Sequence, residues 1–172
     1  MSSVDTVELK YADCPTTEAE VVIAAPPAVL WPLVCDIAMP ARFSSEFQGG
    51  QWLDGAAGPA PGAQFRGRNH HEAVGTWETV STISEFEPER LFGWAVGDPD
   101  VPAARWRFSL EPEASGTRLR QWMQIGPGES GVSALIEQMP DKESRILRRR
   151  LREHHANMTA TLAGIKELAE AP

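Results

Sequence analysis

The stretch ARWRFSLEPEASGTRLRQWMQI, residues 104–125, predicts two neighbouring strands of an antiparallel sheet. Large apolar and polar side chains alternate along Ala104–Leu110, and the apolar face carries Trp106, Phe108 and Leu110. The opposite face carries Arg105, Arg107 and Ser109. The turn residues of Glu111–Gly116 separate this run from a second one, Thr117–Ile125. Such alternation is typical of an antiparallel sheet with one wet face and one sheltered face.

Five further extended runs, separated by Gly, Pro, Asp and Ser, continue this pattern along the chain. They are expected at Thr17–Ile23, Gly50–Asp54, Ala63–His71, Gly75–Phe86 and Arg90–Val96. Together with the two runs above, they make a meander of seven strands. On Gly75–Phe86 one face combines a ring with small hydroxyls, in the order Trp77, Thr79, Ser81 and Ile83. This mixture leaves room on the sheltered face where a tightly packed core would not.

Helical patterns lie after the first strand and at the end of the chain. Ala28–Asp36 is apolar nearly all round and is expected as a buried helix bent or interrupted by Pro32, followed by a short turn at Pro40–Phe43. Val132–Met139 is expected as another short helix, and Asp141 as the N-cap of the last one. That long helix is indicated by apolar residues at helical spacing, namely Leu147, Leu151, Met158, Leu162, Ile165 and Ala169. Its apolar stripe needs a broad surface, which the sheltered sheet face provides.

Length and charge restrict the class of protein. With 172 residues the chain is about one domain long, and we expect a flexible tail over residues 1–16 and a single domain over 17–170. The net charge of −8 disfavours binding to nucleic acid. There is no apolar run long enough for a membrane span and no signal-peptide pattern at the start, so a cytoplasmic protein is expected. Cys14 and Cys35 are expected as free thiols.

Several pieces of the chain resemble the polyketide cyclase/dehydrase branch of the START-like (SRPBCC) superfamily. They are IAAPPAVLWPLVCDIAMPARF (23–43), WLDGAAGPAPGAQFRGRNHH (52–71), TISEFEPERLFGW (82–94), RWRFSLEPEASGTRL (105–119), QMPDKESRILRRRLREHHANM (138–158) and LAGIKELAE (162–170). The resemblance covers about Thr17–Glu170. It implies an α+β helix-grip fold, in which a curved seven-stranded antiparallel sheet surrounds a long C-terminal helix and two short helices follow the first strand. It also implies a cavity for a hydrophobic small molecule.

The four histidines form two adjacent pairs. His70 and His71 lie on a strand and therefore point to opposite faces, while His154 and His155 are about 100° apart on the last helix. A metal site would need both pairs to converge, so we expect neither a metal nor another cofactor. The alternatives for the helical pair are a solvated position and a position at the pocket mouth, where a histidine could transfer protons near neutral pH.

Candidate ligand contacts come from the sheltered strand faces and from the segments expected at the entrance. They are Trp31, Phe43, Phe47, Phe65, Asn69, Trp77, Ser81, Trp106, Phe108 and Met158. Asn69 shares a strand face with Phe65, so its amide is expected either to tie a neighbouring strand or loop or to bind a ligand carbonyl or hydroxyl. Ser81 has the same two alternatives.

Three functions agree with this pattern. The leading hypothesis is binding of a lipid- or polyketide-like molecule between the sheet and the last helix. The second is a cyclase or dehydratase in the same cavity, with Asn69, His154 and His155 as candidate catalytic residues. The third is an accessory protein that docks an acidic carrier protein, for which the candidate contacts are Arg145, Arg148, Arg149 and Arg152. Binding is favoured, because the residues indicate no activated nucleophile, paired carboxylate or metal cluster.

Overall fold

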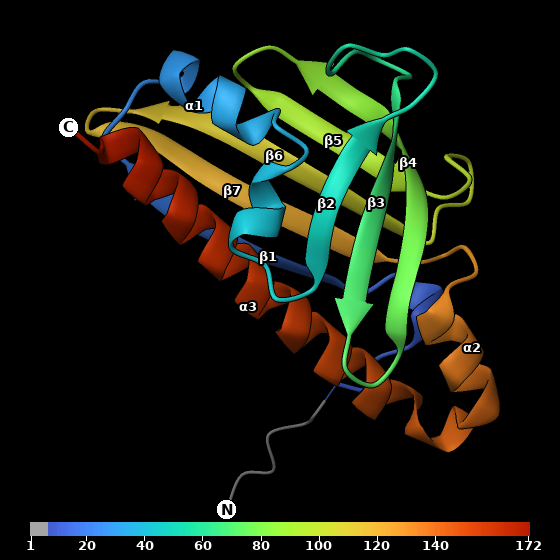
Figure 1. Cartoon of the computed structure of the whole chain (residues 1–172). Helices are drawn as coiled ribbons and strands as arrows, with labels where there is room; N and C mark the ends of the chain where they lie inside the picture. Colours follow the sequence, from blue (N-terminus) through green and yellow to red (C-terminus); the bar gives the residue numbers. More distant parts are fainter. Residues whose placement is uncertain (1–6) are drawn as a thin grey trace, which may run out of the picture.

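The computed structural model describes residues 7–172 and shows one antiparallel sheet packed against a long helix (Figure 1). The strands are β1 (Thr16–Ile23), β2 (Phe47–Trp52), β3 (Gln64–His71), β4 (Gly75–Glu87), β5 (Leu91–Val96), β6 (Ala104–Glu113) and β7 (Gly116–Ile125). They form a seven-stranded sheet in the order β1-β7-β6-β5-β4-β3-β2. The first strand therefore pairs with the last, and β1 and β2 are the two edges.

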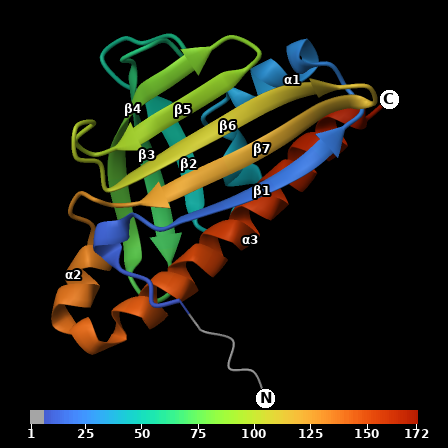
Figure 2. The same ribbon diagram turned by 180° about the vertical axis from the view of Figure 1, so that it is seen from behind.

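Within residues 7–172, three α-helices accompany the sheet: α1 (Pro27–Val34), α2 (Gly131–Gln138) and α3 (Glu143–Glu170). Short 3-10 turns lie at Tyr11–Asp13, Met39–Arg42 and Pro140–Lys142. Helix α3 runs beside β1, while β2, β3 and β4 cross the direction of β6 and β7, so the sheet curves around the helix (Figures 1 and 2). This arrangement confirms the predicted helix-grip fold. Between residues 7 and 172 no helix is long and apolar enough to cross a bilayer.

The register of the strands places the predicted apolar positions on the sheltered face. Trp106 of β6 is opposite Trp94 of β5 on one side and Met123 of β7 on the other. Phe108 and Leu110 follow at alternate positions and are buried, as the sequence pattern predicts. Helix α3 covers this face with the buried side chains Leu147, Met158, Leu162 and Ile165. The hydrophobic core therefore lies between the concave face of the sheet and α3.

The helices differ from the sequence-based expectation in two details. Helix α1 buries only Leu30 and Val34, and Val29 is 47% exposed, so it is not buried all round. It packs with one side on the core, and apolar content alone does not show which side this is. Asp141 lies within a 3-10 turn, and the N-cap of α3 is Lys142, which makes no capping hydrogen bond through its side chain. Asp141 is therefore not the cap.

Strand β2 also begins earlier than expected. It starts at Phe47 instead of Gly50, and its pairing with β3 shifts between Phe47 and Gly49. Gly49 has a φ of 146°, a conformation that glycine adopts readily. The bulge at this glycine lets the strand continue through a stretch without clear alternation, which is why the pattern underestimated its length.

The segment before β1 is attached to the start of α3. The Leu9 amide donates to Ser144 Oγ over 3.0 Å, and the Tyr11 amide donates to Glu143 Oε1 over 2.7 Å. The Tyr11 hydroxyl donates to the Gly128 carbonyl over 2.5 Å. A flexible tail over residues 1–16 stays a prediction, and residues 1–6 lie outside the described part of the chain.

Candidate ligand-binding site

Two stacked indole rings occupy the middle of the sheltered face. The rings of Trp94 and Trp106 have centroids 6.2 Å apart and an interplanar angle of 10°. Their neighbours Phe92 and Phe108 are each 1% exposed, whereas both indoles keep accessible surface. Direct opposition of the two tryptophans across β5 and β6 holds the stack in place. The stack therefore presents an apolar surface that the core residues around it do not fully cover.

His154 of α3 contacts this stack from the helix side. Its ring lies edge-on to the Trp106 ring, with centroids 5.1 Å apart and an interplanar angle of 87°. Burial, and secondly the positive charge of Arg150, hold the pKa of His154 well below its usual range. The ring is therefore neutral at pH 7 and has one N–H donor and one nitrogen acceptor. The adjacent His155 is exposed and lines a shallow outer groove with Arg152.

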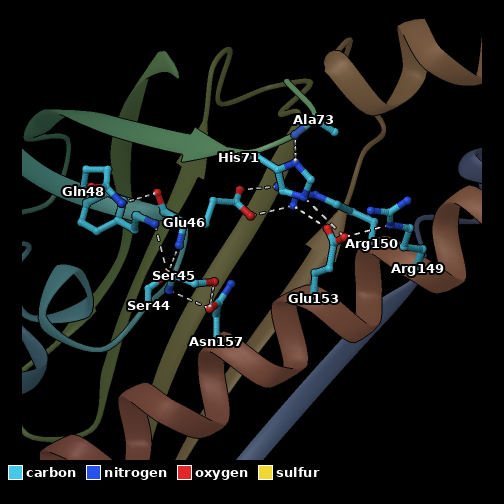
Figure 3. Close-up of polar contacts among 11 residues, drawn as sticks. Ser44, Ser45, Glu46, Gln48, His71, Ala73, Arg149, Arg150, Glu153 and Asn157 are labelled. Atoms are coloured by element: carbon cyan, nitrogen blue, oxygen red, sulfur yellow. Dashed lines mark hydrogen bonds and ion pairs between the residues drawn. The ribbon is translucent and has the colours of Figure 1, made fainter. Parts of the chain in front are cut away.

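A group of charged residues joins α3 to the β2 edge of the sheet (Figure 3). The Arg150 guanidinium makes two hydrogen bonds to the Glu46 carboxylate, one of them 2.7 Å from Nη1 to Oε2. The two side chains are only 17% and 11% exposed. Glu153 accepts from Arg150 over 3.2 Å and from Arg149 over 3.0 Å. We call Glu46, Arg150, Glu153 and His71 the ionic cluster.

Burial and ion pairing act in opposite directions on this cluster. Burial is the largest single influence and disfavours the charge of Arg150, but the hydrogen bonds and charge attraction of Glu46 and Glu153 together outweigh it and raise the pKa of Arg150. Burial likewise opposes the charge of Glu153, and hydrogen bonds from Arg149 and Arg150 nevertheless lower the pKa of Glu153. Both groups are therefore charged at neutral pH, next to the neutral His154.

His71 joins the cluster from the end of β3. Its Nδ1 accepts from the Ala73 amide over 3.1 Å, which leaves the proton on Nε2. That Nε2 lies 3.4 Å from Glu153 Oε1, so the His71 ring is paired with this carboxylate (Figure 3). The amide and the hydroxyl of Ser45 both donate to Asn157 Oδ1 on α3. These contacts fix the helix segment that carries His154 relative to β2 and β3.

One side chain on the sheltered face of the sheet is a glutamine. Gln121 of β7 is 4% exposed, between Phe108 of β6 and Ala19 of β1. Its Oε1 is buried and has no hydrogen-bond partner among residues 7–172. Buried amide oxygens are normally hydrogen-bonded, so this atom is exceptional.

The predicted ligand contacts fall into two groups. Phe65, Ser81, Phe108 and Met158 are all at most 4% exposed and belong to the core. Asn69, Trp77 and Trp106 lie on the same sheltered face and keep accessible surface, with Asn69 directly opposite Trp77.

The residues expected at the entrance pack elsewhere. Trp31 contacts Phe86 and Phe92, at centroid distances of 5.7 and 6.4 Å. The Phe43 ring packs closely on Gly164 of α3, and the Phe47 ring on Gly67 of β3. The structure therefore brings these three residues into packing contacts with the helix and the strands, and it does not bring them to the Trp94–Trp106 stack.

The remaining polar candidates are separate from one another. His70 is exposed, with Nδ1 3.3 Å from the Thr76 hydroxyl, and so it does not meet the helical histidines. Among residues 7–172 there is no group of three or more His, Cys, Asp or Glu that could hold a metal ion. Both cysteines are free, and burial raises the pKa of the Cys35 thiol to about 12.

The arginines proposed for carrier docking have different environments. Arg149 pairs with Glu153, and Arg148 donates to the carbonyl of Val7. Arg145 and Arg152 are exposed. Docking of an acidic carrier stays a prediction.

Sequence reasoning did not assign a place in the site to Glu46, Arg150, Glu153, Trp94 or Gln121. Glu46 and Arg150 are 104 residues apart, and no spacing rule connects a loop carboxylate to a helix at that separation. Gln121 did give a signal, because it interrupts an otherwise apolar alternation between Leu119 and Met123.

A curved seven-stranded sheet that encloses a long C-terminal helix, with aromatic rings on its inner face, defines a helix-grip protein. The family model described as "Polyketide cyclase / dehydrase and lipid transport" matches residues 15–169, so the chain belongs to this family. The resemblance seen in the sequence is thereby confirmed.

Solved structures agree with this assignment. The polyketide-cyclase-like protein Cgl2372 from Corynebacterium glutamicum is 33% identical, with a TM-score of 0.61 over 90% of this chain and 91% of that one. The Zhui aromatase/cyclase from Streptomyces sp. R1128 is 18% identical, with a TM-score of 0.62 over 91% and 96% of the chains. The di-domain ARO/CYC BexL of the BE-7585A biosynthetic pathway is 20% identical, with a TM-score of 0.65 over 92% of this chain and 50% of its own. No curated protein matches the sequence.

Proposed function

We propose that the protein binds a largely apolar, lipid- or polyketide-like small molecule between the sheet and α3, against Trp94 and Trp106. The observation that carries this proposal is the accessible surface of the two stacked indoles, whose neighbouring rings Phe92 and Phe108 are buried. Apolar ring surface is unfavourable in water, and a ligand that covers it gains about 25 cal/mol per Å² buried.

The comparisons support a ligand of this kind. The family description includes both polyketide cyclases and lipid transport, and two structurally similar proteins are named as aromatase/cyclases. Both activities require a site that accepts a long or fused apolar molecule. A site with apolar walls and a few polar groups, here His154, Asn69 and Gln121, has the usual composition of a small-molecule pocket.

Binding of the apolar fluorophore N-phenyl-1-naphthylamine tests the proposal. We expect fluorescence enhancement on addition of folded protein and its reversal by fatty acids or polycyclic aromatics. Trp106→Leu removes one ring of the stack and should weaken binding about 5- to 30-fold. Trp122→Leu is the matched control, because Trp122 packs against Arg107 on the opposite sheet face, 4.9 Å from Cζ to the ring centroid. Equal affinity in the two variants would contradict the proposal.

Catalysis of proton transfer is the second candidate function, and the state of His154 favours it. A half-buried, neutral imidazole next to an aromatic surface can accept a proton from an activated carbon or donate one to a leaving oxygen. Asn69, on the same sheltered face, could hold the substrate carbonyl.

Single-turnover assays with a conjugated polyketone substrate separate this function from simple binding. His154→Gln should lower turnover about 10²- to 10⁴-fold with little change in substrate affinity. His155→Gln is the control, because the adjacent residue is exposed and should retain full activity. No turnover by the wild-type protein, with binding intact, would leave the protein as a carrier.

A further inference from the structure

We propose that Gln121 is the hydrogen-bond anchor of the site, and that the ligand carries a hydroxyl or N–H group that donates to Gln121 Oε1. The inference rests on the proposed function, and it narrows the ligand to molecules that combine a flat apolar body with a donor. Its basis is a single atom: Oε1 of a residue that is 4% exposed and has no partner among residues 7–172.

Two other buried polar side chains, one on the sheet and one on α3, have hydrogen-bond partners within the protein. The Thr117 hydroxyl, on the same strand, donates to the Ala25 carbonyl over 2.7 Å. The Thr161 hydroxyl on α3 donates to the Asn157 carbonyl over 2.9 Å. Gln121 Oε1, by contrast, has no such hydrogen bond among residues 7–172. An unpaired buried oxygen is unfavourable, and a leucine of similar volume would avoid it, so the amide is poorly suited to the unliganded core.

The register places Gln121 beside the stacked indoles. Gln121 is opposite Phe108, and the next pair on the same face is Met123 opposite Trp106. Diagonal neighbours on one face of an antiparallel sheet lie about 7–8 Å apart, within reach of one molecule. On the other side of Gln121 is Ala19, whose side chain is a single methyl group.

The chemistry of the surrounding groups defines the ligand class. The amide oxygen accepts and cannot donate, so a ligand whose only polar atom is an ether or a carbonyl oxygen does not satisfy it. The Trp94–Trp106 stack favours flat rings, and the neutral His154 adds a second polar contact on the helix side. Hydroxylated or amino-substituted aromatic molecules fit all three features.

Three naphthalenes that differ only at one position test the inference by titration calorimetry. The wild-type protein should bind 2-naphthol about 5- to 30-fold more tightly than 2-methoxynaphthalene or naphthalene, because only 2-naphthol has a donor. Gln121→Leu should bind all three with similar affinity. Gln51→Leu, an exposed glutamine on β2, is the control and should keep the wild-type preference.

Thermal unfolding of the unliganded variants gives an independent readout. Removing an unpaired buried oxygen should leave Gln121→Leu as stable as the wild type or more stable. A marked fall in its melting temperature would show that Gln121 has a structural partner and would overturn the inference. Gln121→Met, which is unbranched and of similar length, replaces the leucine variant if that one does not fold.

The outcomes separate this inference from the proposed function. Equal affinity of the wild type for the three naphthalenes overturns the donor requirement and keeps the apolar site. Tightest binding of 2-methoxynaphthalene also overturns the donor requirement, because Gln121 Nε2 would then donate to the ether oxygen of the ligand. Absence of binding by all three contradicts the proposed function together with the inference.

Discussion

Acidification is expected to destabilise the protein through His154. Burial and the nearby Arg150 hold the pKa of this histidine well below its ordinary value of 6.5, which applies in the unfolded chain. The unfolded state therefore binds a proton more readily than the folded state. The stability associated with the neutral ring is fully present above the unfolded pKa, and it is lost as the pH falls below 6.5 towards the folded pKa.

The size of the effect follows from the uptake of one proton. Its slope cannot exceed about 1.4 kcal/mol per pH unit. Between about pH 7.5 and about pH 5.5, the uptake of this proton by the unfolded chain should lower the free energy of unfolding by about 1 kcal/mol. Glu153 does not offset this change, because burial, which would raise its pKa, is outweighed by the hydrogen bonds and charge of its neighbours together, and the pKa of its carboxyl stays below its ordinary 4.5.

Urea denaturation at a series of pH values measures this dependence, followed by far-ultraviolet circular dichroism. The wild type should lose stability over the interval, and His154→Gln should lose about 1 kcal/mol less. His155→Gln is the control for loss of an imidazole, because His155 is exposed. Equal pH slopes for the wild type and His154→Gln would refute the assignment of a half-buried, neutral histidine to this position.

Other perturbations should affect stability in proportion to burial. Arg150→Met leaves the carboxylate of its partner buried without a cation and should cost about 3 kcal/mol in denaturant unfolding, while Arg149→Met, 67% exposed as a side chain, should cost less than about 0.5 kcal/mol. Similar costs for the two would contradict the importance of the ionic cluster. Gly164→Ala places a Cβ 2.4 Å from the Phe43 ring and should cost about 1–3 kcal/mol, whereas Gly131→Ala meets no atom within 4 Å and should be nearly neutral. Dialysis against a chelator should not change the melting temperature, since a structural zinc would contribute about 10 kcal/mol, and a large fall would reveal a metal site that the geometry does not indicate.

The fold could be predicted from the sequence because its main strands and its long helix carry periodic patterns. Alternation along β6 and β4 shows which side chains face inward, and the apolar stripe of α3 shows which side meets the sheet. The resemblance to a known family added the strand number and the enclosed helix. The details that failed, at Asp141 and at Gly49, depend on the local backbone conformation of turns and bulges, which periodicity does not describe.

Only part of the candidate site could be predicted from the sequence. Trp106 and Asn69 follow from strand parity, but His154 and His155 are neighbours on a helix, and sequence alone leaves both orientations open. The ionic cluster depends on long-range contacts between a loop and a helix, so it becomes visible only in three dimensions. Gln121 could have been noticed as a polar residue at an inward position, but the absence of a partner for its oxygen requires the structure.

The most direct test of a ligand site on the sheltered face is a nuclear magnetic resonance titration that follows the indole N–H signals of the six tryptophans. On addition of N-phenyl-1-naphthylamine to the ¹⁵N-labelled protein, we expect the signals of Trp94 and Trp106 to shift most. The Trp122 signal should stay in place, because this ring lies on the outer face of the sheet with Arg107. Shifts confined to Trp122, or no shift of Trp94 and Trp106 at saturating probe, would contradict the account.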